Sequence, residues 1–144
     1  MESFVHLHVH SQYSLLDGQA AIAKMVDKAL GDGMRGMAVT DHGNMFGIKE
    51  FFDYCEKVNK GRSKEGLPPF KPIMGCEVYV ARRGKEEKSD PKLDRRGNHL
   101  ILLAKNQNGY RNLIQLVSRA WVDGFYGCAR TDHADLEKFH EDII

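Results

Sequence analysis

Residues 4–10 read Phe4-Val5-His6-Leu7-His8-Val9-His10, an alternation of apolar and imidazole side chains. Successive side chains of a β-strand point to opposite faces, so the alternation predicts a strand with one apolar face and one face lined by histidines. Alternate residues of a strand stand about 7 Å apart, and two imidazoles at that spacing can converge on a metal ion. Taken alone, the His8-x-His10 spacing fits a metal site and a pair of solvent-facing histidines equally well.

Outward from this segment, helical and strand patterns alternate along the chain. Apolar residues recur with the period of a helix or form the short continuous runs of buried strands. The expected helices are residues 20–30, 44–60, 110–121 and a short one from Asp132, and the expected strands after the first are 36–40, 73–80 and 98–104. This order predicts an α/β sheet or barrel. Because an eight-unit barrel needs about 250 residues and the chain has 144, part of a barrel is expected.

Bulk composition narrows the class of protein. Lys and Arg number 21 against 20 Asp and Glu, and a formal net charge of +1 gives no overall attraction to nucleic acid. Cys55, Cys76 and Cys128 form no CxxC pair, so neither a zinc ribbon nor a disulfide framework is expected and the thiols should be reduced. No signal peptide or membrane-spanning stretch is visible, so a cytoplasmic location without membrane contact is expected.

Candidate metal ligands stand on or next to each expected strand. They are His8 and His10 in the first, His42 after the second, Glu77 in the third and His99 at the start of the fourth. Functional groups gather where strands end in α/β folds, so a shared site is expected. Its mixture of imidazole and carboxylate suits zinc, manganese or iron (Zn, Mn or Fe). His99 opens its strand instead of ending it, and a local antiparallel hairpin would return it beside Glu77.

Other polar residues near these ligands have simpler expected roles. His6 lies one step before the His8-x-His10 pair and is expected to be a hydrogen-bonded interior histidine. Asp41 is expected to orient His42 or a nearby group without binding metal itself.

Asp17 and two later histidines lie outside the expected strands. Asp17 precedes the helix expected near Gln19, where aspartate is a favoured N-cap, so capping and metal binding are both open on residue type alone. His133 and His140 match no ligand pattern and are expected at the surface.

The segment 82–97 carries many charges of both signs. Its basic residues are Arg82, Arg83, Lys85, Lys88, Lys92, Arg95 and Arg96. Its acidic residues are Glu86, Glu87, Asp90 and Asp94. Because the two signs are interspersed, a solvated loop is favoured over a dedicated DNA-binding groove.

Longer motifs run through the whole chain in a fixed order. They are His8-Val-His10-Ser11-x-Tyr13-Ser14-Leu-Leu-Asp17-Gly18, Thr40-Asp41-His42-Gly43-Asn44-x-Phe46-Gly47, Pro72-Ile73-x-Gly75-Cys76-Glu77-x-Tyr79-Val80-Ala81, His99-Leu-x-Leu-Leu-Ala104-Lys105-Asn106, Gly109-Tyr110-x-Asn112-Leu113, Leu116-Val117-Ser118-Arg119-Ala120 and Gly124-Phe125-Tyr126. In order and approximate spacing this series resembles the PHP domain that opens bacterial DNA polymerase III alpha subunits, C-family replicative polymerases.

The resemblance implies a fold and a ligand set. The fold would be α/β, the first part of a distorted PHP-type (β/α)7 barrel that ends before closure, with residues 1–144 as the N-terminal part of one domain. Six positions match the ligands of a family that holds up to three metal ions: His8, His10, Asp17, His42, Glu77 and His99. Further ligands of the family, a His or Cys and an Asp-x-His pair, would come later than Ile144. No catalytic residue is expected beyond the metal site.

The resemblance also implies a function. The intact protein would be a DNA-directed DNA polymerase of DNA replication, with magnesium (Mg) in a palm domain absent here. Its partners would be DNA and other replicative polymerase subunits, including a proofreading subunit. The metal-binding barrel would be a phosphoesterase or 3′-5′ exonuclease, inactive in these 144 residues alone.

Two alternatives are a stand-alone metal-dependent phosphatase of small phosphate monoesters and a purely structural interaction module. An open barrel edge at residues 100–103 and an apolar helix bearing Trp121 lead us to expect self-association.

Overall fold

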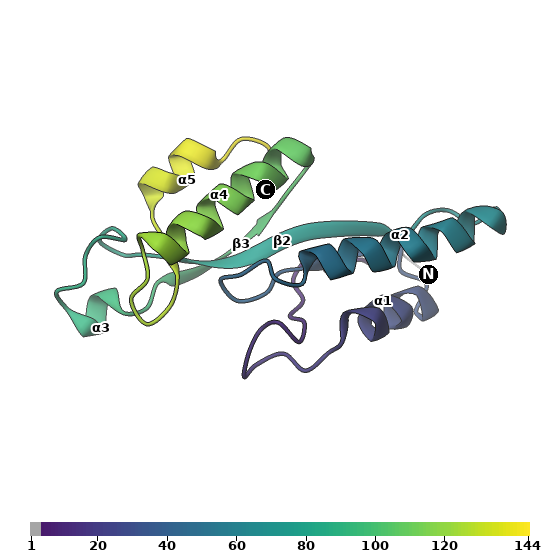
Figure 1. The fold of residues 1–144 in the computed structure, drawn as a ribbon, viewed down its shortest axis with the longest axis horizontal. Coiled ribbons are helices and arrows are strands. Elements are labelled where there is room, and N and C mark those ends of the chain that lie inside the picture. Colours follow the sequence, from purple (N-terminus) through teal and green to yellow (C-terminus); the bar gives the residue numbers. More distant parts are fainter. Residues whose placement is uncertain (1–3) are drawn as a thin grey trace.

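A ten-residue strand, β2 (Lys71–Val80), runs through the centre of the molecule in the computed structural model, which describes residues 4–144 (Figure 1). The other elements, in chain order, are α1 (Ile22–Gly31), β1 (Gly36–Val39), α2 (Ile48–Lys64), α3 (Pro91–Asp94), β3 (Asn98–Leu103), α4 (Gln107–Val122), β4 (Arg130–Thr131) and α5 (His133–Phe139). Figure 1 shows α1 and α2 toward one end of β2, and α4 and α5 toward the other. The mixed α/β class predicted from the sequence is confirmed.

The sheet is built on both edges of β2. On one edge β1 pairs in parallel with residues 71–74, an isolated bridge joins His42 to Glu77, and β4 pairs in parallel with Tyr79 and Val80. On the other edge β3 runs antiparallel to residues 75–80. The hairpin considered for β2 and β3 is therefore confirmed, and the strand pairing is parallel on the opposite edge only.

Two apolar clusters pack against this sheet. The first joins α1, α2 and β1, and its fully buried members include Ile22, Val26 and Phe51. The second joins β2 and β3 to α4, with Cys76, Val78 and Val80 of β2 packed in it. Because side chains alternate along a strand, Glu77 and Tyr79 project from the opposite face of β2.

The N-terminal segment departs from the predicted strand. Its backbone forms one bridge, from His6 to Met37, and the next bonds run from Ala38 N to His6 O and from Thr40 N to Val9 O. Between these two bonds the N-terminal segment advances three residues, from His6 to Val9, whereas the facing chain advances two, from Ala38 to Thr40. The extra residue breaks the alternation of faces. As a result Leu7 is 52% exposed instead of buried.

His6 corrects a second prediction about the same segment. Its side chain is exposed and packs edge-on against the Phe4 ring, so it is not an interior histidine. His133 and His140 are exposed, as predicted.

The second helix begins and ends later than predicted. Asn44 opens a turn instead of a helix, because its side chain bonds the carbonyls of Tyr13 and His42 and the amide of Phe46. The helix therefore starts at Ile48, and it continues through Gly61 to Lys64. The short elements α3 and β4 were not predicted, although Asp90, which caps α3, and Pro91 at its start were usable signals. Asp132 caps α5 as predicted by accepting a hydrogen bond from the Asp135 amide.

The next features are the state of the cysteine thiols and the length of the helices. All three cysteines are free, and burial raises the pKa of the Cys76 thiol to about 12. None of the helices formed by residues 4–144 combines the length and the apolar character needed to cross a membrane.

Candidate metal centre

Six side chains from four parts of the chain meet above the face of β2 that carries Glu77. They are His8, His10 and Asp17 of the N-terminal segment, His42 after β1, Glu77 of β2 and His99 of β3. They form three overlapping groups of three, and the ligand atoms in each group lie within 4.8 Å of one another. The sequence thus predicted which six side chains converge; that they bind metal stays a prediction.

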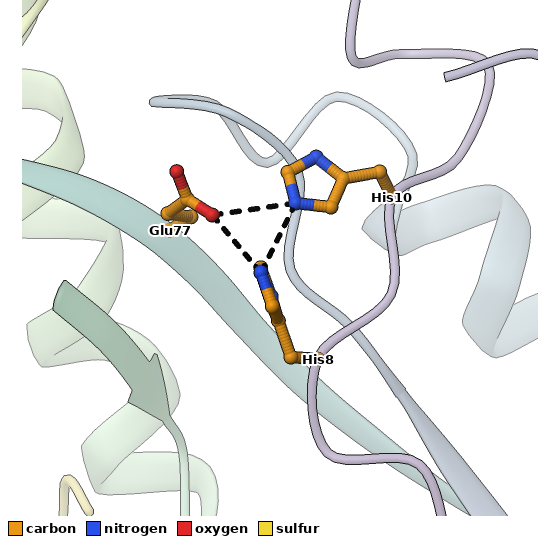
Figure 2. A group of neighbouring side chains, drawn as sticks. All are labelled: His8, His10 and Glu77. Atoms are coloured by element: carbon orange, nitrogen blue, oxygen red, sulfur yellow. Dashed lines mark hydrogen bonds and ion pairs between the residues drawn. The ribbon is translucent and has the colours of Figure 1, made fainter. Parts of the chain in front are cut away.

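Glu77 is the centre of this arrangement and is only 3% exposed. Its Oε2 atom lies 3.1 Å from Nε2 of His8 and 3.3 Å from Nε2 of His10 (Figure 2). Its Oε1 atom lies 2.9 Å from Nδ1 of His42 and also contacts Nδ1 of His99. Within the described residues Oε1 has no hydrogen bond of good geometry, so a buried carboxylate oxygen faces ring nitrogens without a proper donor.

Hydroxyl groups lie behind the rings of His8 and His10 and contact Nδ1 of each. Nδ1 of His8 lies 2.8 Å from Oγ1 of Thr40, which can also donate to the Val9 carbonyl. Nδ1 of His10 lies 3.1 Å from Oγ of Ser14, which donates its hydrogen to Asp41. Ser14 must accept from His10, because its hydrogen goes to the Asp41 carboxylate, so the neutral His10 ring carries its proton on Nδ1 and presents the Nε2 lone pair to Glu77. The contact between Thr40 and His8 fits either tautomer of the His8 ring.

Asp41 holds the loop from which His10 projects. Its buried carboxylate accepts from the Ser11 amide at 2.6 Å, the Ser11 hydroxyl at 2.7 Å and the Ser14 hydroxyl at 2.7 Å. Ser14 also accepts from the His42 amide at 3.1 Å. The predicted orienting role of Asp41 therefore has a geometric route through Ser14 to His10 and to the backbone of His42.

Asp17 points into the centre and caps no helix. The residue before α1 is Ala21, which makes no side-chain cap, whereas Oδ2 of Asp17 lies 2.7 Å from Nε2 of His42. The hydrogen bond from His42 lowers the pKa of the Asp17 carboxyl, so it is an anion at neutral pH.

His99 reaches the centre because β3 runs back along β2. It stands directly opposite Tyr79 in the antiparallel register, and paired residues of neighbouring strands share a face. The Tyr79 hydroxyl lies 2.9 Å from Nδ1 of His42, and its ring is edge-on to His99. Burial, and after it the charge of Glu77, raises the pKa of Tyr79 to about 12, so this hydroxyl keeps its proton.

The His10 ring is held in its neutral form. Burial lowers its pKa, and the nearby His42 adds to that effect, while Glu77 opposes it. A neutral imidazole is the form that donates an electron pair to a metal.

Three supporting residues had no predicted role, although their motifs were visible. Thr40, Ser14 and Tyr79 each bond a ring nitrogen of a candidate ligand. The i, i+4 spacing of His10 and Ser14 and the i, i+2 spacing of Glu77 and Tyr79 were usable signals, but only contacts from the fold connect them.

The residues present fit a divalent cation. Lone pairs of ring nitrogens and carboxylate oxygens face one another at short range, and such electron donors repel unless a proton or a cation lies between them. Imidazole and carboxylate are ligands of Zn, Mn and Fe. Groups behind them already fix ring orientation, as is usual for metal-binding histidines.

Comparison with known proteins gives the family. The sequence model of the PHP domain family matches residues 6–144 of this chain. This chain belongs to the PHP domain family. The resemblance found in the motifs is confirmed, since relatives named DNA polymerase III subunit alpha align over nearly the whole chain.

Those relatives are much longer than this PHP chain. The protein of Borreliella burgdorferi is 46% identical over 141 residues, 98% of this chain and 11% of the relative. That of Treponema pallidum is 46% identical over 142 residues, 99% of this chain and 11% of the relative. Among solved structures, an amidohydrolase from Chromobacterium violaceum is similar with a TM-score of 0.46 and 21% identity, over 81% of this chain and 32% of that one.

Proposed function

We propose that this PHP segment holds one or two divalent ions, Zn, Mn or Fe, for hydrolysis of phosphate esters. The proposed ligands are His8, His10, Asp17, His42, Glu77 and His99. One observation carries the proposal: the Nε2 atoms of His8 and His10 and the Oε2 atom of Glu77 lie 3.1–3.3 Å from one another around one point.

The chain's own residues supply binding and orientation in this proposal. Bound ions would supply an activated water and a polarised phosphate oxygen. Thr40 and Ser14 hold the histidine rings, and Asp41 holds Ser14. No further side chain is proposed as catalytic.

We infer that the segment is the N-terminal part of the PHP barrel of a longer DNA polymerase III alpha subunit. Support comes from relatives of which it spans 11%. That protein would replicate DNA in the cytoplasm with Mg in its palm domain. It would bind DNA and other polymerase subunits, with a proofreading subunit among them. The PHP centre would then act as a 3′-5′ exonuclease, and barrel closure would come from residues beyond 144.

The direct test uses the longer polymerase protein that contains this segment. Glu77→Gln should abolish Mn- or Zn-dependent release of nucleotides from a 3′-labelled DNA strand, whereas Glu137→Gln, an exposed change on α5, should not. Primer extension should survive in both variants. Nuclease activity unchanged by Glu77→Gln would refute the proposal.

Two alternatives make different predictions in the same assays. A phosphatase of small monoesters would cleave p-nitrophenyl phosphate faster than a DNA strand. A purely structural module would bind no metal and lose polymerase stability, not nuclease activity, on substitution. The 144-residue chain alone is expected to be inactive on all these substrates, since the resemblance implies further ligands.

A further inference from the structure

A pocket of about 460 Å³ opens beside the metal centre and is not used by it. It is lined by Tyr79, Arg95, Arg96, Gly97, His99, Gly127 and Cys128. His99 is a proposed ligand and Tyr79 bonds His42, so the pocket shares a wall with the centre.

Arg95 and Arg96 face this pocket without a carboxylate partner. Both side chains are exposed, and neither forms an ion pair with any carboxylate in residues 4–144. By contrast, Arg83 pairs with Asp94, and Arg119 pairs with Asp135. Two adjacent free guanidinium groups beside a proposed phosphate site form a local basic patch in a chain of near-zero net charge.

A buried arginine fixes the backbone that carries this pair. Arg130 is fully buried, and its guanidinium donates to the carbonyl oxygens of Lys85 at 2.7 Å, Glu87 at 3.1 Å and Asp94 at 2.5 Å. Asp94 also accepts from Arg83 through both carboxylate oxygens. The loop is therefore held to β4 up to the residue before Arg95, and the pair is presented on a fixed support.

Two glycines set the shape of the pocket. A Cβ on Gly97 would lie 2.7 Å from the backbone N and O of Val80, so only glycine lets the segment lie flat against β2 beside Tyr79. Gly127 has a φ of +77°, and a Cβ there would lie 2.8 Å from Cγ of Arg95. Side chains at either position would displace Arg95 or Arg96 from the pocket.

We propose that Arg95 and Arg96 form an anion subsite for a second phosphate group of a substrate whose first phosphate lies at the metal centre. This assignment rests on the proposed function and deepens it. Guanidinium groups bind phosphate through paired charge-assisted hydrogen bonds. A ligand with two linked phosphates, a short nucleotide chain, would use both sites, and a small monoester would use one.

The first arm of the test examines the subsite without metal. Inorganic phosphate is titrated into the metal-free chain while backbone amide signals are followed by NMR. Signals of Gly97 and Gly127 should shift, and Arg95→Gln/Arg96→Gln should abolish the shift. Lys57→Gln/Lys60→Gln removes the same charge from exposed positions on α2 and should leave the shift intact.

The second arm measures ligand choice in the zinc-loaded chain. Calorimetry compares a 5′-phosphorylated thymidine dinucleotide with thymidine 5′-monophosphate. Arg95→Gln/Arg96→Gln should weaken dinucleotide binding by about tenfold or more and change monophosphate binding by less than about twofold. Arg95→Lys/Arg96→Lys keeps the charge and should restore part of the affinity, which also checks that loss does not come from misfolding.

The outcomes separate this proposal from the metal site. No shift at Gly97 and Gly127, or equal losses for dinucleotide and monophosphate, would overturn the second-phosphate assignment. Failure of the chain to retain zinc would refute the metal centre, while phosphate-dependent shifts lost in the arginine variant would still support the subsite.

Discussion

The Nε2 atoms of His8 and His10 lie 3.3 Å apart. Ser14 donates to Asp41 and accepts from Nδ1 of His10, so Nε2 of the neutral His10 ring carries no proton. That lone pair faces Nε2 of His8, and the Glu77 carboxylate lies 3.1 and 3.3 Å from the two nitrogens. The fold thus holds a ring lone pair and a carboxylate oxygen together, an arrangement that a bound cation would stabilise.

Replacing Asp41 by Asn should weaken both the fold and metal binding. The buried carboxylate accepts three hydrogen bonds, and an amide can replace only some of them. We expect a loss of about 1–3 kcal/mol in the free energy of unfolding. Zinc affinity should fall by about 10–100-fold because the loop bearing His10 loosens.

Denaturant unfolding and competition with a chromophoric chelator measure these two effects. Asp53→Asn is the matched control, since Asp53 forms an exposed i, i+4 pair with Lys49 and should cost less than about 0.5 kcal/mol. If Asp41→Asn binds zinc as tightly as the control, the prediction is wrong, because Ser14 would then orient His10 without the hydrogen bond to Asp41.

Asp135→Asn should destabilise the C-terminal part of the fold. Asp135 is buried and bonds Lys85 and Arg119, and Lys85 is buried with it. Removing the buried carboxylate leaves Lys85 with only the more distant Asp123 carboxylate at 3.9 Å, so a loss of about 3–5 kcal/mol is expected in chemical unfolding. A loss below about 1 kcal/mol would mean that water reaches Lys85 readily.

The same carboxyl makes stability depend on pH. Burial alone would raise the Asp135 pKa, but hydrogen bonds from Lys85 and Arg119 outweigh it and lower the pKa below 3.8. The unfolded chain therefore takes up this proton first as pH falls, so the stabilisation is present above pH 4 and is lost below it. Unfolding midpoints between pH 6 and 3 should fall more steeply for wild type than for Asp135→Asn.

Much of the centre was predictable because most of its ligands lie in or next to strands, where the backbone fixes the face to which each side chain points. The proximity of Glu77 and His99 could be inferred from the hairpin pattern. The proximity of His42 to them could be inferred from its place directly after a buried strand. The supporting residues were not predictable in the same way. No periodic pattern in the sequence marks Arg130. Its guanidinium donates to three carbonyl oxygens of a loop that lies 36 to 45 residues earlier in the chain.

The first segment shows why local patterns failed. The alternation in residues 4–10 predicts a regular strand, but one extra residue opposite β1 shifts the side chains after His6. That shift turns Leu7 outward. Such a register change cannot be predicted from sequence periodicity, because the register depends on hydrogen bonds to a strand about 30 residues away.

Self-association stays a prediction, with its surface redefined by the fold. Leu102 and Leu103 are buried, and Leu103 exchanges two backbone hydrogen bonds with Ile144, so this end of β3 is covered. Leu100 and Trp121 are 40% and 44% exposed. We expect a concentration-dependent dimer in sedimentation equilibrium that Leu100→Lys weakens, because a charge on an edge strand opposes pairing. A monomer at millimolar concentration would contradict this.

The central claim is that the cluster around Glu77 binds metal, and metal retention tests it most directly. The purified chain is incubated with Zn or Mn, passed through gel filtration and analysed for bound metal by mass spectrometry. We predict one to two ions per wild-type chain and less than about a tenth of that in His8→Ala/His10→Ala. His133→Ala/His140→Ala, which removes two exposed histidines, should match wild type. Wild type free of metal, or a His8→Ala/His10→Ala variant that retains as much as wild type, would contradict the claim.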